Sequence, residues 1–175
     1  RPHSKTNKSP YWVRKQLEAG AIGVCCAKVG EAEVMVEAGV PEVMIPNQVI
    51  GKRKIARLVA LARSARIIVA AESSGNVDDL SEASTVAGAE LGVIVEINVG
   101  MDRCGVDGDG AVELAKQIDA APGLRFDGLM GYEGHVVAER DYEVRKSEAE
   151  KAMAILTGAA DQIRNVGIDV KLVSA

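Results

Sequence analysis

The amino-terminal segment places basic side chains at alternate positions, Arg1, His3 and Lys5. In a β-strand, side chains two residues apart lie on one face, so this spacing would gather three cations there. An amine held beside other cations at the mouth of a low-dielectric pocket loses its proton more readily and becomes a Schiff-base nucleophile toward an aldehyde. Alternatively, Arg1, Lys5 and Lys8 form a solvent-exposed basic N-terminus, and the segment alone leaves both interpretations open.

A second group of polar residues lies in and after an apolar run. Residues 95–105 read Val-Glu-Ile-Asn-Val-Gly-Met-Asp-Arg-Cys-Gly, and period-two alternation puts Glu96 and Asn98 on one face, with Arg103 in the loop beyond. Arg103 could donate a charge-assisted hydrogen bond to a phenolate or a carboxylate. A structural ion pair between Glu96 and Arg103 is the alternative, and the sequence does not separate the two.

A third group follows the apolar run that ends at residue 132. The chain has only one Trp, three Tyr and one Phe, and Tyr132 stands three residues before His135, one of its two histidines. A tyrosine at a strand end can pack on a flat ring, and a histidine there can shuttle protons. A surface tyrosine near a solvated histidine is the plainer alternative.

Three other patterns do not support a site. Residues 107–110 read Asp-Gly-Asp-Gly, but Ala111 and Val112 follow where a calcium loop needs a ligand and a glycine. The adjacent Cys25 and Cys26 point to opposite faces of a strand and cannot hold one metal together. No Gly-x-Gly-x-x-Gly motif follows a strand. We therefore predict no metal ligands and no nucleotide site within this chain.

The elements that must position these residues alternate between short apolar runs and helical periodicity, and Gly or Pro marks most of the changes. Several runs are apolar on both faces, as in strands of a parallel sheet covered by helices. Asn76 and Asp109 are expected to cap helices, and a long charged helix is expected over Tyr142–Asn165. The seven predicted strands are Arg1–Lys5, Ile22–Ala27, Glu42–Pro46, Arg66–Ala71, Gly92–Val99, Phe126–Tyr132 and Asp169–Ser174.

This α/β alternation fits a (β/α)8 TIM-type barrel or an open doubly wound sheet. A complete barrel takes about 250 residues. Seven strands within 175 residues indicate a compact barrel that lacks its last unit. The abrupt first and last residues agree with a chain truncated on the C-terminal side and at the N-terminus. We therefore expect one partial barrel domain over residues 1–175, with its site at the carboxyl ends of the strands.

The composition excludes several classes of protein. The chain has 21 Lys and Arg against 25 Asp and Glu, a net charge of −4, and 47% of its residues are hydrophobic, which argues against disorder and against a basic nucleic-acid-binding surface. No apolar run approaches the roughly 20 residues that a membrane span requires. The three cysteines form no even disulfide framework and suit a reducing compartment. We expect a cytoplasmic protein without nucleic-acid or membrane partners.

Given these residues, the chain resembles the barrel domain of the fold-type III pyridoxal-phosphate enzymes, specifically the D-threonine aldolase and D-serine dehydratase group related to alanine racemase. The resemblance spans essentially all 175 residues. Its most specific part is residues 1–8, Arg-Pro-His-Ser-Lys-Thr-Asn-Lys, which is similar to the group's Arg-Pro-His-x-Lys-Thr-x-Lys segment. The resemblance implies that Lys5 holds pyridoxal 5′-phosphate as an internal aldimine. The group usually has His where Asn7 stands, which leaves the assignment of Lys5 intact.

The same resemblance implies roles for four more residues. Residues 99–105 are similar to the loop whose arginine contacts the ring oxygen of the cofactor, here Arg103. Tyr132 matches the aromatic residue against the pyridine ring, and Ser174 matches the first member of the phosphate cradle. In the aldolases, a histidine shortly after the aromatic residue deprotonates the substrate hydroxyl, and His135 stands near that position. Family members also have a C-terminal β-domain with a divalent-metal site, which the full-length protein is expected to contain.

The function implied by the resemblance is a lyase that depends on pyridoxal phosphate and on a divalent metal, Mn, Mg or Zn. It would cleave β-hydroxy-D-amino acids such as D-threonine to glycine and an aldehyde, with Lys5 and His135 as catalytic residues. A D-serine or D-3-hydroxyaspartate dehydratase is one alternative, and a non-catalytic pyridoxal-phosphate homeostasis protein is a second. A barrel without a cofactor is a third. A small-molecule D-amino acid and a second copy of the chain, as a homodimer, are the partners that the family implies.

Overall fold

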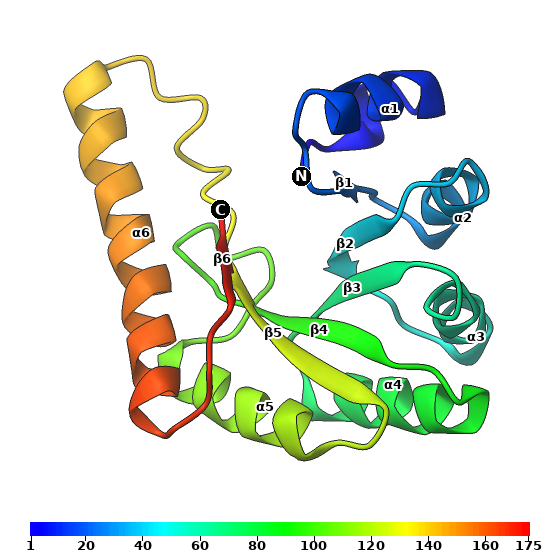
Figure 1. Cartoon of the computed structure of the whole chain (residues 1–175). Coiled ribbons are helices and arrows are strands. Elements are labelled where there is room, and N and C mark those ends of the chain that lie inside the picture. The colour runs from blue at the N-terminus through cyan, green and yellow to red at the C-terminus, as the bar shows by residue number, and fades with distance from the viewer.

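The computed structural model describes residues 1–175 and contains one curled sheet of six parallel strands (Figure 1). The strands follow one another across the sheet in chain order, and one helix separates each strand from the next. They are β1 (Val24–Cys25), β2 (Glu42–Gln48), β3 (Arg66–Ala71), β4 (Leu91–Glu96), β5 (Leu124–Met130) and β6 (Leu172–Ser174). This arrangement confirms the expected α/β class and a partial TIM-type barrel.

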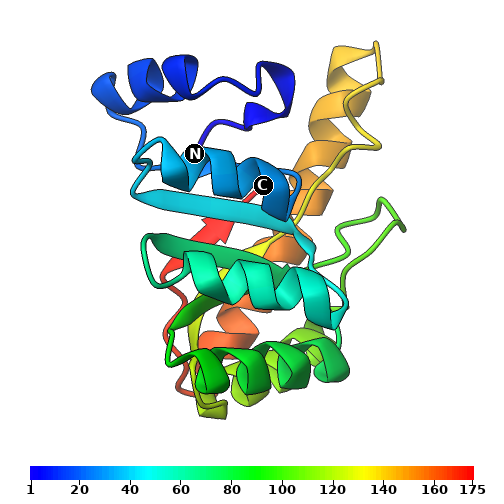
Figure 2. The same cartoon turned by 90° about the vertical axis from the view of Figure 1, so that its right-hand side faces the viewer.

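Helices line the outer side of the curl, as Figures 1 and 2 show. They are α1 (Pro10–Glu18), α2 (Val29–Glu37), α3 (Lys52–Leu61), α4 (Ser74–Ala87), α5 (Gly108–Ala120) and α6 (Tyr142–Asn165), with a short 3-10 helix, η1, at Ser4–Thr6. The bounds of α6 match the prediction from the sequence. None of the helices combines the length and the apolar character needed to cross a membrane.

Six of the seven predicted strands are confirmed; Arg66–Ala71 has its predicted bounds, and the other five differ from prediction at one or both ends. The predicted strand at Arg1–Lys5 is wrong: only His3 forms a parallel bridge, to Cys25, and the chain then turns into η1. Two local causes are visible. Pro2 has no N–H to donate to a neighbouring strand. The side chain of His3 accepts a hydrogen bond from the N–H of Lys5, which caps the turn.

The sheet is apolar on both faces, as predicted. A cluster of 35 buried residues fills the layer between the sheet and the helices, and a cluster of 5 lines the inner face. Adjacent residues of one strand alternate between them, so that Ile67 belongs to the larger cluster and Ile68 to the smaller. Cys26 packs in the larger cluster and Cys25 against the smaller, which confirms that the two thiols point to opposite faces.

Both predicted helix caps are wrong. Asn76 lies inside the first turn of α4, where its Nδ2 donates to the carbonyl of Val49 at 3.1 Å. α5 is capped by Asp107, which accepts a hydrogen bond from the N–H of Gly110, and not by Asp109. Where several capping residue types stand within three positions, the loop geometry decides which one caps the helix, and the sequence does not show that geometry.

Candidate functional site

A cavity of about 380 Å³ opens at the carboxyl ends of the strands and extends along the inner face of the sheet. Its lining brings together four of the predicted site residues, Lys5, Arg103, Tyr132 and Ser174. These residues come from four separate parts of the chain: η1, the loop after β4, the segment after β5, and β6. The placement agrees with the expectation that polar side chains at this end of a parallel sheet form a site.

Lys5 reaches this cavity from the turn that follows the bridge at His3. The N–H of Cys25 donates to the carbonyl of Pro2 at 2.8 Å, and Oγ of the buried Ser4 donates to the carbonyl of Cys25 at 3.0 Å. These contacts hold the segment against β1, while Lys5 itself is exposed at the cavity. The lysine therefore stands at the mouth of the pocket and can be reached by a ligand.

His3 lies beside Lys5 and also lines the cavity. Its Nδ1 accepts a hydrogen bond from the backbone N–H of Lys5 at 3.2 Å, so this nitrogen carries no proton. Partial burial lowers the pKa of His3 below 6.5, and the positive charge of Lys5 lowers it further. The imidazole is neutral at neutral pH and fixes the turn that presents the lysine. The sequence placed His3 near the site but did not reveal this capping role.

Arg103 lies over the ring of Tyr132, with 5.4 Å from its guanidinium carbon to the ring centroid. This geometry is a cation–π contact, which holds the two side chains together on the cavity lining. Nη2 of Arg103 is also 4.0 Å from Oε1 of Glu96. The ion pair considered from the sequence is therefore present but long, and Arg103 still lines the cavity.

A buried carboxylate anchors the loop that carries Arg103. Glu96 is 3% exposed; its Oε2 accepts from Nε2 of Gln48 at 2.5 Å, and its Oε1 accepts from Sγ of Cys104 at 3.0 Å. Burial raises the pKa of the Cys104 thiol, and the hydrogen bond to Glu96 raises it further, so the thiol stays protonated and donates. Nearby, Oε2 of Glu72 accepts from the N–H of Gly105 at 2.5 Å.

Ligand atoms of Glu72, Glu96 and Cys104 lie within 4.8 Å of one another, a spacing that a metal ion could bridge. Both oxygens of Glu96 and Oε2 of Glu72 already accept hydrogen bonds from the protein. These contacts hold the loop that carries Arg103. The sequence singled out Glu96, but Glu72 and Cys104 were missed, because their contacts depend on the pairing of β3 with β4.

Asn98 shapes the same loop from within. Its Oδ1 accepts from the N–H groups of Gly100 and Asp102 at 3.0 and 3.1 Å, and its Nδ2 donates to the carboxylate of Asp102 at 2.8 Å. Asp102 has a φ of +54°, which this local bonding supports. Asn98 therefore follows β4 as a turn residue, and the expectation that it shares a strand face with Glu96 is wrong.

His135 does not line the cavity and is exposed. It lies against the loop of Arg103, since a Cβ built on Gly100 would stand 3.4 Å from its Nε2. It shares with Tyr132 the segment that follows β5, at the same end of the sheet. The structure thus brings His135 to the border of the site without placing it beside Lys5.

A second, larger cavity of about 710 Å³ lies outside the sheet, between α2 and α3. Lys8, Lys28 and Lys54 stand on its lining, but none of the predicted site residues does. The two cavities share Ala27 and Asn47, and Nδ2 of Asn47 donates to the carbonyl of Ala27 at 3.2 Å. Size alone would favour this outer cavity, whereas the predicted site residues gather around the smaller one.

Comparison with known sequences identifies relatives over the whole chain. A family model described as alanine racemase, N-terminal domain, matches residues 1–175. D-threonine aldolase of Arthrobacter sp is 41% identical over 169 residues, which cover 96% of this chain and 45% of that protein. 3-Hydroxy-D-aspartate aldolase of Paracoccus denitrificans is 38% identical over 178 residues, covering 99% of this chain and 46% of that protein. The chain spans about half the length of these relatives.

Solved structures match the fold closely. The crystal structure of D-threonine aldolase from Filomicrobium marinum superposes with a TM-score of 0.98 at 44% identity, covering 100% of this chain and 48% of that one. D-threo-3-hydroxyaspartate dehydratase from Delftia sp. HT23 superposes with a TM-score of 0.88 at 23% identity, covering 99% of this chain and 47% of that one. The second likeness shows the shared fold alone.

Proposed function

The chain belongs to the alanine racemase N-terminal domain family, and on that premise we propose that its full-length protein is an aldolase. It binds pyridoxal 5′-phosphate at Lys5 and cleaves β-hydroxy-D-amino acids to glycine and an aldehyde. The single observation that carries this proposal is the meeting of Lys5, Arg103, Tyr132 and Ser174 around one cavity. Two relatives at 41% and 38% identity are named as aldolases of such substrates.

The residues present fit this cofactor. A primary amine can condense with its carbonyl group, a guanidinium can donate to its ring oxygen, and an aromatic face can pack on its ring. Lys5, Arg103 and Tyr132 supply these three groups on one lining, and Ser174 adds a hydroxyl at the edge formed by β6. The cavity volume of about 380 Å³ lies within the range of small-molecule sites.

When bound, the cofactor supplies an electron sink for the bond that breaks at Cα of the substrate. The residues of this chain hold and orient the reactants. Lys5 would hold the cofactor through its carbonyl group, and the charge of Arg103 would favour the ionised form of its ring oxygen. Tyr132 would pack on the ring, and its own contact with Arg103 keeps both side chains in place. Ser174 would bind the phosphate.

Cleavage between Cα and Cβ requires that the β-hydroxyl lose its proton as the aldehyde carbonyl forms, and that Cα gain a proton to give glycine. We assign the first proton transfer to His135, because an imidazole can accept and donate a proton and His135 borders the site. The position of His135 on the segment that begins with Tyr132 supports this assignment. The divalent metal, the C-terminal β-domain and a cytoplasmic homodimer remain part of the proposal on family resemblance alone.

The proposal is tested with the full-length protein and three substrates, D-threonine, D-serine and D-3-hydroxyaspartate, each with and without a chelator. We expect glycine and an aldehyde from β-hydroxy substrates, with loss of turnover in the chelator. Release of ammonia and a 2-oxo acid would instead identify a dehydratase. Retention of the cofactor without turnover of any of the three would identify a carrier, and a colourless protein that borohydride does not label would refute cofactor binding.

A further inference from the structure

Few backbone hydrogen bonds join the segment that carries Lys5 to the sheet. His3 is its single bridged residue, and one hydrogen bond joins the carbonyl of Pro2 to the N–H of Cys25. The hydroxyl of Ser4 adds one bond to the carbonyl of Cys25. A displacement of about 1 Å at a reacting group can cost about a hundredfold in rate. The segment therefore needs a further anchor to hold the lysine in place.

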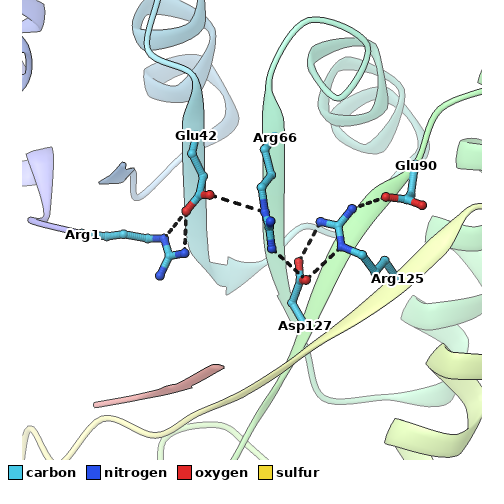
Figure 3. A network of polar contacts seen from close by, with 6 residues as sticks. All are labelled: Arg1, Glu42, Arg66, Glu90, Arg125 and Asp127. Carbon is cyan, nitrogen blue, oxygen red and sulfur yellow. Dashed lines mark hydrogen bonds and ion pairs between the residues drawn. The ribbon is translucent and has the colours of Figure 1, made fainter. Parts of the chain in front are cut away.

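Arg1 provides that anchor through Glu42, the first residue of β2. Nε and Nη2 of Arg1 each lie 2.5 Å from Oε1 of Glu42, and the two side chains are only 13% and 15% exposed (Figure 3). Charges shielded from water in this way attract each other more strongly than exposed ones. Gly23, just before β1, lets the chain lie close to the start of β2, since a Cβ there would lie 2.7 Å from the carbonyl oxygen of Glu42.

Glu42 belongs to a larger set of alternating charges. Its Oε2 lies 3.4 Å from Nε of Arg66, and Nη2 of Arg66 lies 3.0 Å from Oδ1 of Asp127. Arg125 holds Asp127 with two bonds of 2.9 Å and also contacts Glu90. We name these six residues the amino-end network: Arg1, Glu42, Arg66, Glu90, Arg125 and Asp127 (Figure 3).

Two features of the sheet allow this network to cross it. Asp127 is the extra residue of a bulge in β5, where the register with β4 shifts between Val93 and Ile94. On β4, Gly92 has no side chain; a Cβ there would lie 2.8 Å from Nη2 of Arg125 and would collide with the carboxylate of Asp127. The network therefore passes over β4 and connects the start of the chain with β5.

The two connected segments are opposite walls of the candidate cofactor cavity. Arg1 begins the segment that presents Lys5, and Asp127 lies on β5, which leads to Tyr132. We propose that Glu42 and Asp127 are positioning residues, which tie these segments together at the amino ends of the strands and thereby set the placement of Lys5 opposite Tyr132. The inference rests on the proposed function, because it concerns the same cavity.

The test is Glu42→Gln in the full-length protein, which removes the charge and keeps the volume. Glu90→Gln is the matched control, because Glu90 belongs to the same network, is 64% exposed and contacts Arg125 but not Arg1. We expect Glu42→Gln to weaken the affinity for pyridoxal phosphate about tenfold and to shift the pH midpoint of its visible absorbance. Hydrogen exchange in residues 1–8 of the cofactor-free protein should also become faster, while the control changes none of these.

Unchanged affinity together with unchanged exchange in residues 1–8 overturns the inference. So does a variant whose only change is a lower unfolding temperature, since that marks a purely structural network. If Glu42→Gln does not fold, Arg1→Lys replaces it, because lysine keeps the charge and loses the two-nitrogen contact with Glu42. Failure of the wild-type protein to bind the cofactor refutes the proposed function instead, and the exchange measurement still decides whether the network positions the segment.

Discussion

The two ends of the sheet use their charged side chains in opposite ways. At the amino ends, the amino-end network joins its cations and carboxylates by ion pairs of 3.4 Å or less. At the carboxyl ends, Lys5 has no carboxylate within 4.0 Å. Arg103 has one carboxylate nearby, that of Glu96, at a distance of 4.0 Å. Charges paired within the chain hold the fold together, whereas unpaired charges around a cavity remain available to a ligand. The paired charges thus hold the segments that form the cavity, and the carboxyl ends carry the charged side chains that a ligand can reach.

Removing the amine of Lys5 should have the largest effect on cofactor binding and turnover. In the full-length protein, we expect Lys5→Ala to abolish the visible absorbance of retained cofactor and to lower turnover by about a thousandfold or more. Lys8→Ala is the control, since Lys8 pairs with Glu31 at 3.1 Å and lines the other cavity. Absorbance and activity assays measure both variants. Undiminished colour in Lys5→Ala would eliminate the assignment.

His135→Ala tests whether the proton transfer takes place at the border of the cavity. We expect cleavage of D-threonine to slow by about 10²- to 10⁴-fold, the usual contribution of a general base, while cofactor affinity stays the same. Arg140→Gln changes an exposed residue of the same loop and should leave cleavage intact. Retained cleavage in His135→Ala would move the role to another group.

Asp127→Ala removes a central carboxylate of the amino-end network. Asp127 is 1% exposed and lies between Arg66 and Arg125, so its loss leaves two cations without their shared carboxylate. We expect the free energy of unfolding to fall by about 3–5 kcal/mol, measured by urea denaturation. Glu90→Ala, at the exposed end of the network, should cost about 1 kcal/mol or less. Equal losses in the two variants would show that burial does not set the strength of these contacts.

Arg103→Ala tests whether this guanidinium at the carboxyl ends of the strands binds the cofactor. Loss of a charge-assisted hydrogen bond to the ring oxygen should weaken cofactor affinity by about 1.5–3 kcal/mol, or roughly tenfold to a hundredfold. Arg103→Lys should fall between wild type and Arg103→Ala, because an ammonium group lacks the planar face that covers Tyr132. If the dissociation constant is the same in all three proteins, Arg103 serves only as the distant ion-pair partner of Glu96.

The smallest expected effect is a pH dependence carried by His3. Its pKa in the folded protein is lowered from 6.5, first by burial and then by the charge of Lys5. Between the lowered value and 6.5, the unfolded chain binds more protons, so stability rises with pH across this window and is lost as the pH falls through it. His3→Asn should reduce the drop in unfolding temperature on acidification. An identical drop in both proteins would contradict this account.

The sequence predicts the fold best where a strand is buried on both faces. Arg66–Ala71 is predicted with its observed bounds, because five consecutive apolar residues leave little choice of register or end. The Arg1–Lys5 segment fails, since its alternating pattern suits a strand but Pro2 and the His3 cap end the pairing after one bridge. Local hydrogen bonds outweigh a period-two pattern in a segment this short.

The gathering of Lys5, Arg103, Tyr132 and Ser174 could be predicted from residue types at strand ends together with the family resemblance, and the cavity confirms that they meet. Their individual roles remain predictions. The amino-end network could not be predicted from the sequence. Its contacts require that Glu42 align with residue 66 and that a bulge place Asp127, and both depend on how the strands pair.

The two cavities share part of one wall. Asn47 and Ala27 line both spaces and are joined by a single hydrogen bond. A substitution at Asn47 that removes this bond would therefore alter the lining of both spaces at once, although Lys5 lies on the inner one alone.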